Sequence, residues 1–364
     1  MKISSIEIFR FNLPLKSPLN ISGKEIHSRP GLLLSLSGQS GHRGYGEISP
    51  LSGLHRENLI KALRQISALR SFLREVELPG EDDKPVDYLD RLWETIRPLP
   101  SVQFGVELAL LNLRAQTQDV SLCRLFSEKC HTTVKVNGLL TGSEENLRAE
   151  VEKLRDAGYC SVKMKVGRKT IEEDARRVLE LREAAGEKIA IRLDANRAWE
   201  LPQAVEFGTA VASCRIEYIE EPVKDISQLE PFYRGTGIPV ALDESLPALW
   251  EKRQANTPGI AAYILKPSVI GSIGQTIRLA REAVNSGKKP VFSCAFLSGI
   301  GLSAVAQLAA AVAPAAVATG LDTYRWLAED LLVHPFRVVN GQVNIDELNR
   351  YGTVIRPDLV ERVF

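Results

Sequence analysis

The chain has 364 residues, of which 44% are hydrophobic and 25% charged, a composition typical of globular proteins. Its 46 basic and 45 acidic residues give a formal net charge of +1, which does not favour a nucleic acid as partner. The longest apolar stretch, 308–317, is shorter than the roughly 20 residues of a membrane span, so no membrane partner is expected. The first residues alternate as a strand does and lack an apolar export signal, and the scattered cysteines form no CxxC pair. We therefore expect a cytoplasmic protein.

The first third of the chain predicts an α+β capping domain, which we assign to residues 1–130. Its apolar residues pass from alternating to helical spacing instead of repeating β/α units. The patterns predict strands at 3–13 and 31–37, a glycine-rich turn at 41–50, and helices at 56–75, 86–97 and 101–118.

Residues 131–330 have a different rhythm, in which short β-rich runs alternate with amphipathic runs such as 171–185 and 273–286. The β-rich runs are 134–140, 161–166, 189–196, 216–222, 239–245, 262–267, 290–296 and 318–321. Eight such units predict an α/β fold, a (β/α)8 barrel of the TIM type. A helix-capping signal lies at 141–145. An open six-stranded sheet is the alternative, but it requires a glycine-rich fingerprint that GLLTGS, after the first run, does not supply.

The C-terminal segment, residues 331–364, is expected to return to the capping domain. The run 336–346 has alternating apolar residues on both sides of Asn340-Gly341, which is a strong hairpin signal. We expect this hairpin to pack against the N-terminal strands and so to join both chain ends in one domain.

Charged and polar residues end five of the predicted barrel strands, where barrel enzymes carry their catalytic groups. They are Lys163 and Lys165, Asp194 and Asn196, Glu220 and Glu221, Asp243 and Glu244, and Lys266. Residues two apart share a face of a strand, so Lys163 and Lys165 point the same way. Adjacent residues point to opposite faces, and the spacing does not say which member of each acidic doublet faces inward.

Three neighbouring strands that end in acids predict a divalent cation. Like charges about 4 Å apart repel by roughly 4 kcal/mol per pair at an effective dielectric constant of 20, and a cation removes this repulsion. Oxygen ligands without His or Cys favour Mg²⁺ over zinc, and they do not exclude Mn²⁺. A solvated or salt-bridged strand end explains any one of these residues, but charges at five strand ends together favour a site.

The lysines predict a base. A lysine with its ordinary pKa of about 10.4 is almost fully protonated at pH 7, and a neighbouring ammonium group and a metal ion would lower that pKa. Lys163 is such a neighbour for Lys165, and Lys266 arrives from the far side of the barrel. The pattern predicts an enzyme that removes a proton beside the carboxylate of a small-molecule substrate, with the metal stabilising the developing charge.

At these residues the chain resembles the enolase superfamily, in its muconate-lactonizing subgroup, over nearly its whole length. The motifs KMK, DAN, EEP, DES and LKP follow the superfamily's order and spacing. The resemblance implies three metal ligands and two acid/base lysines, namely Asp194, Glu220 and Asp243, and Lys165 and Lys266. Lys163, Arg192 and Asn196 would support this site, although Arg192 is equally consistent with an ion pair in the barrel core.

Within the subgroup the chain is most similar to the o-succinylbenzoate synthase family of menaquinone biosynthesis, the MenC family. This similarity rests on the segments GEISPL, PSVQFG, RLDANRAW and GLDT. It implies a hydro-lyase that converts 2-succinyl-6-hydroxy-2,4-cyclohexadiene-1-carboxylate to 2-succinylbenzoate by syn dehydration. Lys165 would remove the proton, Mg²⁺ would stabilise the enediolate, and Lys165 would then protonate the leaving hydroxyl while Lys266 stabilises the anion from the opposite face.

Substrate contacts are expected at Ser293, Ser298 and Gly299. The run Gly299-Ile300-Gly301 precedes an apolar helix and is interpreted either as a source of backbone N–H groups for a substrate carboxylate or as a tight strand-to-helix turn. The seventh predicted strand, SCAFLSG, departs from the more Ser-rich, acid-containing run of the family. The glycine-rich turn at 44–46 is interpreted as a lid over the barrel, with a plain surface turn as the alternative.

Other functions remain open for this sequence. An N-acylamino acid racemase, a dipeptide epimerase or a muconate cycloisomerase of the same superfamily would use the same two lysines. A non-catalytic barrel scaffold would be expected to have lost at least one of the lysines or acids, and none is lost. The sequence leaves open whether the protein is a monomer or a homo-oligomer.

Overall fold

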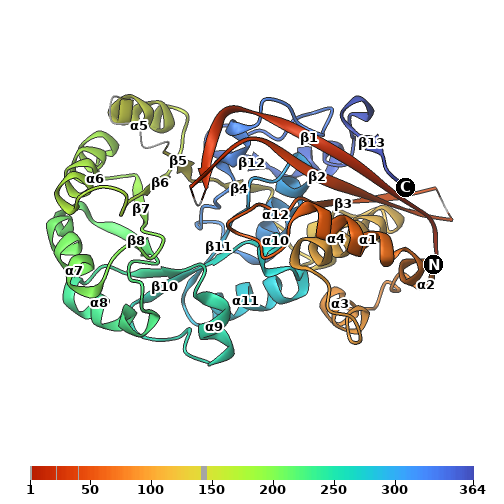
Figure 1. Cartoon of the computed structure of the whole chain (residues 1–364), viewed down its shortest axis with the longest axis horizontal. Helices are drawn as coiled ribbons and strands as arrows, with labels where there is room; N and C mark the ends of the chain where they lie inside the picture. Colours follow the sequence, from red (N-terminus) through yellow and green to blue (C-terminus); the bar gives the residue numbers. More distant parts are fainter. Residues whose placement is uncertain (1, 22, 40, 141–145) are drawn as a thin grey trace.

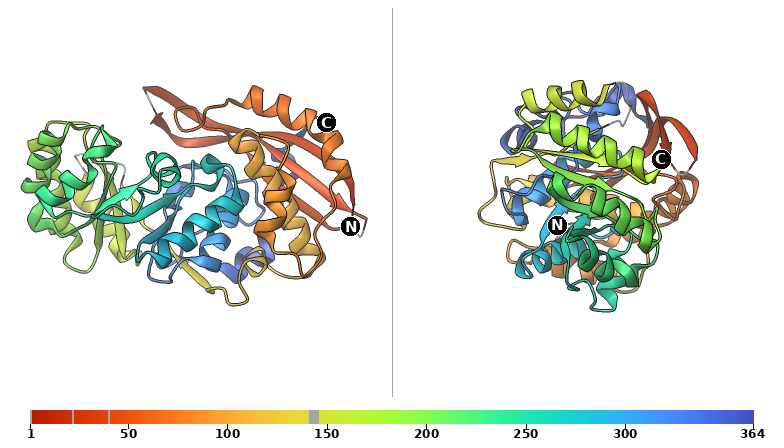
Figure 2. Two further views of the ribbon diagram at one scale, coloured as in Figure 1. Left: turned by 90° about the horizontal axis from the view of Figure 1, so that it is seen from below. Right: turned by 90° about the vertical axis from the view of Figure 1, so that its left-hand side faces the viewer.

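The computed structural model describes residues 2–21, 23–39, 41–140 and 146–364. A barrel-like part and a capping part lie side by side, and both chain ends are on the capping side (Figure 1). Figure 2 shows helices on the outside of the curled sheet of the barrel-like part. The capping signal predicted at 141–145 lies outside the described residues. No helix within the described ranges has the length and apolar character needed to cross a membrane.

The capping part is built on a four-stranded sheet in the order β13-β1-β2-β3. Its strands are β1 (Ile3–Ile21), β2 (Lys24–Gly38), β3 (Arg43–Ile48) and β13 (Glu361–Arg362). β1 and β2 form a long antiparallel hairpin whose tip reaches toward the barrel (Figure 1). The two predicted strands are confirmed as parts of this hairpin. The predicted turn at 41–50 is wrong, because most of that segment is β3.

The glycines of β3 allow close packing on a helix. A Cβ atom at Gly44 would lie 2.0 Å from the carbonyl oxygen of Ala109, and one at Gly46 would lie 1.8 Å from that of Gly105. Both carbonyls belong to α4 (Pro100–Thr117), a largely buried helix. Strand and helix approach this closely because both positions in β3 lack a side chain. The other helices here are α1 (Leu59–Ala68), α2 (Arg70–Glu75) and α3 (Pro85–Leu92).

The barrel-like part is a curled parallel sheet in the order β11-β10-β9-β8-β7-β6-β5. Its strands are β5 (Gly138–Leu139), β6 (Ser161–Lys165), β7 (Ala190–Asp194), β8 (Ile216–Glu220), β9 (Val240–Leu242), β10 (Ile260–Leu265) and β11 (Lys289–Phe292). Seven of the eight predicted runs overlap these strands. The eighth forms isolated parallel bridges, from Thr319 to Val136 and from Gly320 to Ser293. The fold is therefore α/β, with a curled sheet consistent with a TIM-like barrel and a capping domain.

Helices follow the barrel strands in chain order. They are α5 (Leu147–Asp156), α6 (Ile171–Ala185), α7 (Leu201–Ala210), α8 (Leu229–Thr236), α9 (Leu246–Glu251), α10 (Pro267–Ile270), α11 (Ile273–Asn285) and α12 (Gly299–Val312). Short 3-10 helices are η1 (Leu122–Leu125), η3 (Ala212–Cys214), η4 (Ile226–Gln228), η5 (Asp322–Trp326) and η6 (Pro357–Leu359). α6 begins as predicted because Thr170 and Glu173 form a capping box at its start, and it ends as predicted before Gly186, which has a φ of 65°.

The C-terminal segment contacts two separate parts of the molecule. Val339 and Gln342 bridge across the predicted Asn340-Gly341 turn, and β12 (Gln342–Asn344) then pairs with β4 (Thr133–Lys135). The prediction that this hairpin packs on the N-terminal strands is therefore wrong. β13 makes that contact instead, by pairing with β1 after the short helix α13 (Ile345–Tyr351).

Candidate active site

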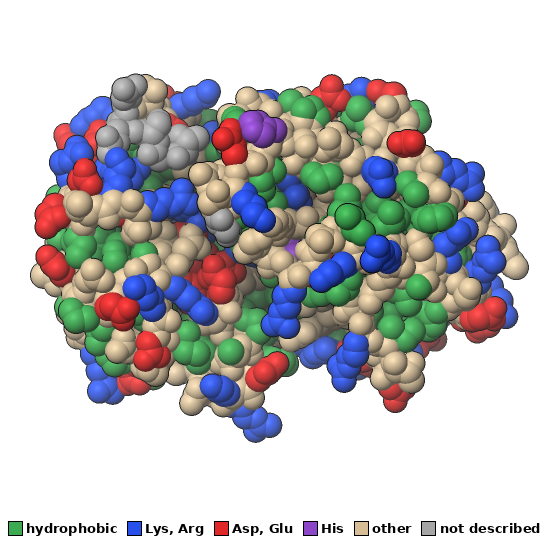
Figure 3. All heavy atoms as spheres, viewed as in Figure 1, with side chains coloured by type: hydrophobic (Ala, Val, Ile, Leu, Met, Phe, Trp, Pro, Cys, Tyr) green, Lys and Arg blue, Asp and Glu red, His purple; other side chains and the backbone are tan. Residues whose placement is uncertain are grey.

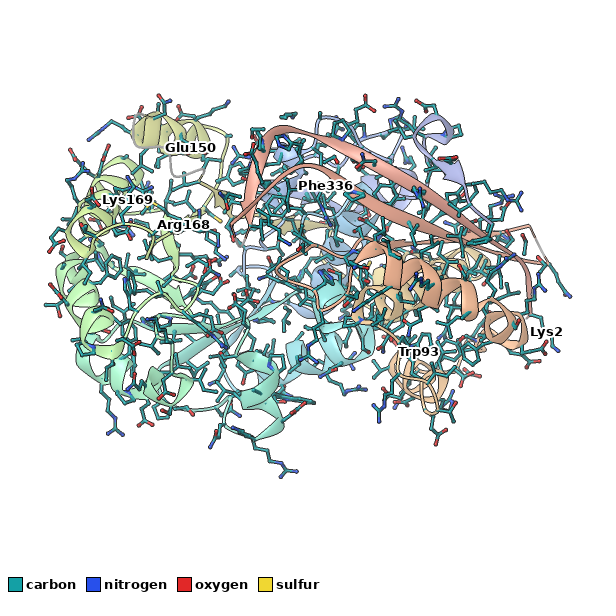
Figure 4. The ribbon with its side chains drawn as sticks, viewed as in Figure 1. Lys2, Trp93, Glu150, Arg168, Lys169 and Phe336 are labelled. Atoms are coloured by element: carbon teal, nitrogen blue, oxygen red, sulfur yellow. The ribbon has the colours of Figure 1, made fainter. Side chains whose placement is uncertain are left out.

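A cavity of about 480 Å³ lies at the carboxyl ends of the barrel strands, where the capping part meets the barrel. Charged side chains border this hollow in Figure 3. The capping part contributes Asn20 and Ile21 from the β1–β2 tip, and Gly53 and Leu54 from the segment after β3. The charged lining residues of the barrel are Lys163, Lys165, Arg168, Asp194, Glu244, Lys266 and Asp322. Arg168 follows β6 and is labelled in Figure 4.

Lys163 joins the ends of two neighbouring strands. Its Nζ lies 2.9 Å from Asp194 Oδ2 and 2.6 Å from Glu220 Oε2. The two carboxylates come together because Asp194 and Glu220 are partners in the parallel register of β7 and β8. Both acids are buried, so their charges depend on this lysine.

Lys165 points to the same face as Lys163, as their spacing predicts. Its Nζ lies 3.3 Å from Asp194 Oδ2, and it also donates to Asn196 Oδ1. Asn196 in turn donates to Glu244 Oε1 at 3.2 Å. Lys165 is more exposed than Lys163, with a side-chain exposure of 38% against 15%, so it is the more accessible of the pair to a bound molecule.

Lys266 forms an ion pair with Asp243. The neighbouring acid Glu221 is also buried, but it binds the backbone at the end of β9. Its Oε1 accepts from the backbone nitrogens of Asp243 and Ser245, each at 2.8 Å, and its Oε2 accepts from Arg197 at 3.2 Å. Of each acidic doublet, Glu220 and Asp243 are thus the members that meet the lysines.

The ionisable groups of the cluster shift one another's pKa values because they lie close together. Burial raises the pKa of Glu220 to about 7, and the charges of Asp194 and Asp243 act in the same direction. Burial alone would raise the pKa of Asp194, but Lys163 holds it below its ordinary value. Burial alone would lower the pKa of Lys266, yet Asp243 and Glu220 hold it above its ordinary value.

The predicted metal ligands have the chemistry that Mg²⁺ requires. Three carboxylates from adjacent strands supply only oxygen, and Glu220 Oε1 is buried and accepts no hydrogen bond from any residue that the structure describes. In this arrangement lysine ammonium groups meet the carboxylates, and no three His, Cys, Asp or Glu side chains of the described ranges are spaced to hold a metal ion. The donor set fits the cation in its chemistry, and the carboxylates that would hold it are paired with lysine ammonium groups in this structure.

Arg192 lies in the barrel core, where the alternative interpretation put it. Its Nε donates to Glu217 Oε2 at 2.6 Å, and its Nη1 donates to Asn137 Oδ1 at 3.0 Å. Glu217 lies at a register shift between β7 and β8, where a residue of β8 is left without a partner. The arginine also stacks over the ring of Tyr218, so it orders the barrel interior.

The structure separates the three residues expected to contact the substrate. Ser293 lines the cavity. Ser298 and Gly299 have their polar groups bound elsewhere. The N–H groups of Gly299 and Gly301 donate to carboxylates of this chain, which contradicts the interpretation that this run offers them to a substrate. The backbone nitrogen of Ser298 donates to Glu47, and that of Gly299 donates to Asp330 Oδ1 at 2.7 Å. Helix α12 therefore has carboxylates of this chain at its N-terminus already.

The lid interpretation of the glycines at 44–46 is wrong, because these residues are buried against α4. Residues of the β1–β2 tip and of 53–54 border the cavity in their place. Sequence reasoning missed them because all but Asn20 carry small or apolar side chains, and no motif marks Asn20 as a site residue. The contact of Glu221 with the end of β9 was missed because it depends on a turn, with a φ of 47° at Glu221, that strand alternation does not describe.

Family models match both parts of the chain. Residues 146–359 match a model described as enolase C-terminal domain-like, and residues 3–113 match the MenC N-terminal domain. The chain is 33% identical over 325 residues to the o-succinylbenzoate synthase of Yersinia enterocolitica, covering 87% of this chain and 89% of that enzyme. It is 34% identical over 371 residues to the chloroplastic protein PHYLLO of Arabidopsis thaliana; this match covers 92% of this chain but only 22% of that protein.

Solved structures share the fold at lower identity. The N-succinyl Arg/Lys racemase of Bacillus cereus matches with a TM-score of 0.85 at 22% identity, over 100% of both chains. A dipeptide epimerase of Cytophaga hutchinsonii, complexed with Mg and a dipeptide, matches with a TM-score of 0.84 at 23% identity, over 100% of this chain and 99% of that one. Site geometry, family models and fold thus agree with the resemblance inferred from the motifs, and the chain belongs to the enolase superfamily, with a MenC-type N-terminal domain.

Proposed function

We propose that the protein is an o-succinylbenzoate synthase, a hydro-lyase of menaquinone biosynthesis. The observation that carries this proposal is the pair Lys165 and Lys266, which line one cavity and contact different members of one carboxylate cluster. The identity to the Yersinia enterocolitica enzyme over most of both chains supports the choice of reaction. The substrate is 2-succinyl-6-hydroxy-2,4-cyclohexadiene-1-carboxylate, and the products are 2-succinylbenzoate and water.

The proposal includes Mg²⁺ held by three carboxylates, those of Asp194, Glu220 and Asp243, which are the metal ligands that the family resemblance implies. When bound, the cation supplies positive charge opposite the substrate carboxylate and so stabilises the negative charge that develops there. The dipeptide epimerase of Cytophaga hutchinsonii, which shares the fold, is described as complexed with Mg. Mn²⁺ offers the same hard-cation chemistry to these ligands.

Lys165 acts as the base and then as the acid. In its neutral form its amine takes the proton from the ring carbon beside the carboxylate, and the ammonium group then gives a proton to the leaving hydroxyl on the same face. The C–H and C–O bonds break, a ring double bond forms, and water leaves, so the ring becomes aromatic. Lys266 would keep its proton and stabilise the anionic ring from the opposite face.

The proposal also includes the domain boundaries and the closure of the barrel. We assign residues 1–130 and 331–364 to the capping domain and 131–330 to a (β/α)8 barrel, with 318–321 as its eighth strand. The parallel bridges of Thr319 and Gly320 to segments on either side of them support that closure. We also propose that the protein acts in the cytoplasm.

Replacing the lysines tests the proposed function. We expect Lys165→Ala to lower kcat by about a thousandfold, because it removes both proton transfers, and Lys266→Ala to lower it by about a hundredfold or more. Formation of 2-succinylbenzoate by the purified protein with Mg²⁺ is the measurement. Lys224→Ala, which removes a surface lysine paired with Glu200 in the same barrel, is the control and should keep full activity. A wild-type protein that does not turn over the cyclohexadiene would refute the proposal.

Racemisation of N-succinyl amino acids is the second candidate. It is favoured by the full-length structural match to the N-succinyl Arg/Lys racemase of Bacillus cereus, and two lysines on opposite faces of a carbon also suit racemisation. Incubating the wild-type protein with N-succinyl amino acids in D₂O distinguishes the two. Deuterium exchange and loss of optical rotation without turnover of the cyclohexadiene would favour the racemase.

A further inference from the structure

Two buried charged residues of the capping part reach into the barrel beside the cavity. Arg29 of β2 is 2% exposed and Glu47 of β3 is 1% exposed. Both contact the segment 293–298, which joins β11 to α12. Neither residue lines the cavity, so any effect on a bound substrate must pass through this segment.

Arg29 binds the backbone of the segment. Its Nε donates to the carbonyl oxygen of Phe296 at 2.9 Å, and its Nη2 lies 3.3 Å from that of Ala295. The same Nη2 donates at 2.8 Å to the carbonyl oxygen of Ser49, beside β3. The guanidinium group thus ties two consecutive carbonyl groups of the barrel to the capping sheet. Burial lowers its pKa to about 10, so the group stays charged at neutral pH.

Glu47 binds the end of the same segment and the start of α12. Both of its carboxylate oxygens lie 3.1 Å from the backbone nitrogen of Ser298, and Oε2 also accepts from the Ser298 hydroxyl at 2.6 Å. A further bond comes from the backbone nitrogen of Gly301, at 3.1 Å. These donors belong to the N-terminal turn of a helix, which favours a carboxylate at that position.

The segment between these contacts forms a wall of the cavity and is conformationally strained. Ser293, Cys294 and Phe296 line the cavity. Phe296 has a φ of 53°, a left-handed conformation that a bulky residue adopts only when its surroundings hold it there. Its ring packs edge-on against Trp326, with centroids 6.2 Å apart. The direction of the ring therefore depends on a backbone conformation that Arg29 fixes from outside the cavity.

We propose that Arg29 and Glu47 are positioning residues through which the capping domain sets the wall at 293–298, and hence the fit of the part of the substrate distant from the reacting carbon. The kinetic part of this proposal rests on the proposed function, whereas the structural part does not. The substrate group concerned is the side chain beyond the ring, because the ring carboxylate is directed to the lysines and acids on the other strands.

Arg29→Lys tests the proposal, since a lysine keeps the charge beside Glu47 but cannot reproduce the planar guanidinium contacts with the neighbouring carbonyl groups. Arg114→Lys is the matched control, because Arg114 is also a buried arginine of the capping part and donates to three backbone carbonyls, those of Gly80, Glu81 and Asp83. We expect amide hydrogen exchange in 295–301 to become about tenfold faster in Arg29→Lys and to stay unchanged in Arg114→Lys.

The kinetic readout uses the same two variants. We expect Arg29→Lys to raise KM about tenfold, the factor expected for the loss of a charged hydrogen bond, with a change in kcat below about threefold. Unchanged exchange and unchanged KM in Arg29→Lys would overturn the proposal, and so would an equal rise of KM in Arg114→Lys. If Arg29→Lys does not fold, Glu47→Gln is judged by the same two measurements. If the wild type fails to turn over the cyclohexadiene, the proposed function falls and hydrogen exchange alone decides the positioning role.

Discussion

Glu220 and Glu221 are adjacent in the chain and serve different purposes. Glu220 ends β8 beside Lys163, at the carboxylate cluster. Glu221 turns away with a φ of 47° and accepts the backbone N–H groups of Asp243 and Ser245. One carboxylate thus takes part in the charge cluster, and the next fixes the strand end from which another acid of that cluster projects. At the residue scale, the positions of the site residues depend on buried carboxylates, each of which binds a specific lysine or backbone N–H donor.

Glu107 is a buried acid outside the site whose protonation is expected to affect stability. It accepts from Trp93 Nε1 at 3.0 Å and Gln103 Nε2 at 2.8 Å, and from the backbone nitrogen of Ile273 at the start of α11. Burial raises its pKa from 4.5 to about 7, against the effect of these hydrogen bonds. The folded protein therefore holds this proton more tightly than the unfolded chain does.

The resulting stabilisation is fully present below about pH 4.5 and is lost as the pH rises through about 7, by at most about 3 kcal/mol. We expect Glu107→Gln to flatten this part of the dependence of the unfolding free energy on pH, measured by urea denaturation between pH 4.5 and 8. Glu94→Gln, at an exposed position, controls for the loss of one negative charge. An equal slope in wild type and Glu107→Gln would contradict the assignment.

At the element scale, the contact of β3 with α4 depends on the absence of side chains. A Cβ atom at Gly46 would meet the backbone of Gly105 at 1.8 Å, and a backbone atom cannot turn aside as a flexible side chain can. We expect Gly46→Ala to destabilise the protein by about 2 kcal/mol or more, because strand and helix must separate. Thermal unfolding is the measurement, and Gly80→Ala, whose Cβ would meet only Asp83 Oδ2 at 3.6 Å, is the control. A Gly46→Ala variant with unchanged stability would refute this account of the contact.

The elements that could be predicted from sequence are those with local signals. Helix α6 carries its own capping box, and the barrel strands carry apolar runs that end in polar residues, so both were located correctly. The sequence of β3 predicts a turn because its glycines, which serve packing on α4, resemble turn residues. The predicted partner of β12 is wrong, because a hairpin signal locates a turn but does not determine which other strand the hairpin pairs with.

The same limit applies to the site. Alternation predicts that Lys163 and Lys165 share a face, and both do contact Asp194. It does not distinguish Glu220 from Glu221, since the chain turns between them. The link from Arg29 to the carbonyl group of Phe296 joins residues 267 positions apart, and no local pattern carries that information.

At the scale of the whole molecule, the barrel supplies the charged groups and the capping domain closes the space above them. The β1–β2 tip and residues 53–54 border the cavity directly, whereas Arg29 and Glu47 act through the segment after β11. In the proposed function a substrate would be enclosed between two parts of the chain that are held together by buried contacts. The proposed reaction centre draws on side chains at the ends of strands β6 to β10, and the proposed fit of the substrate depends on both parts.

The central claim is that three carboxylates hold one cation while an amine stands on each side of the bound molecule. A crystal structure with Mg²⁺ and 2-succinylbenzoate tests it most directly. We predict a single Mg²⁺ bound by Asp194, Glu220 and Asp243, with the Nζ atoms of Lys165 and Lys266 on opposite faces of the ring carbon that carries the carboxylate. A cation bound elsewhere, or both amines on one face of the ring, would contradict the account.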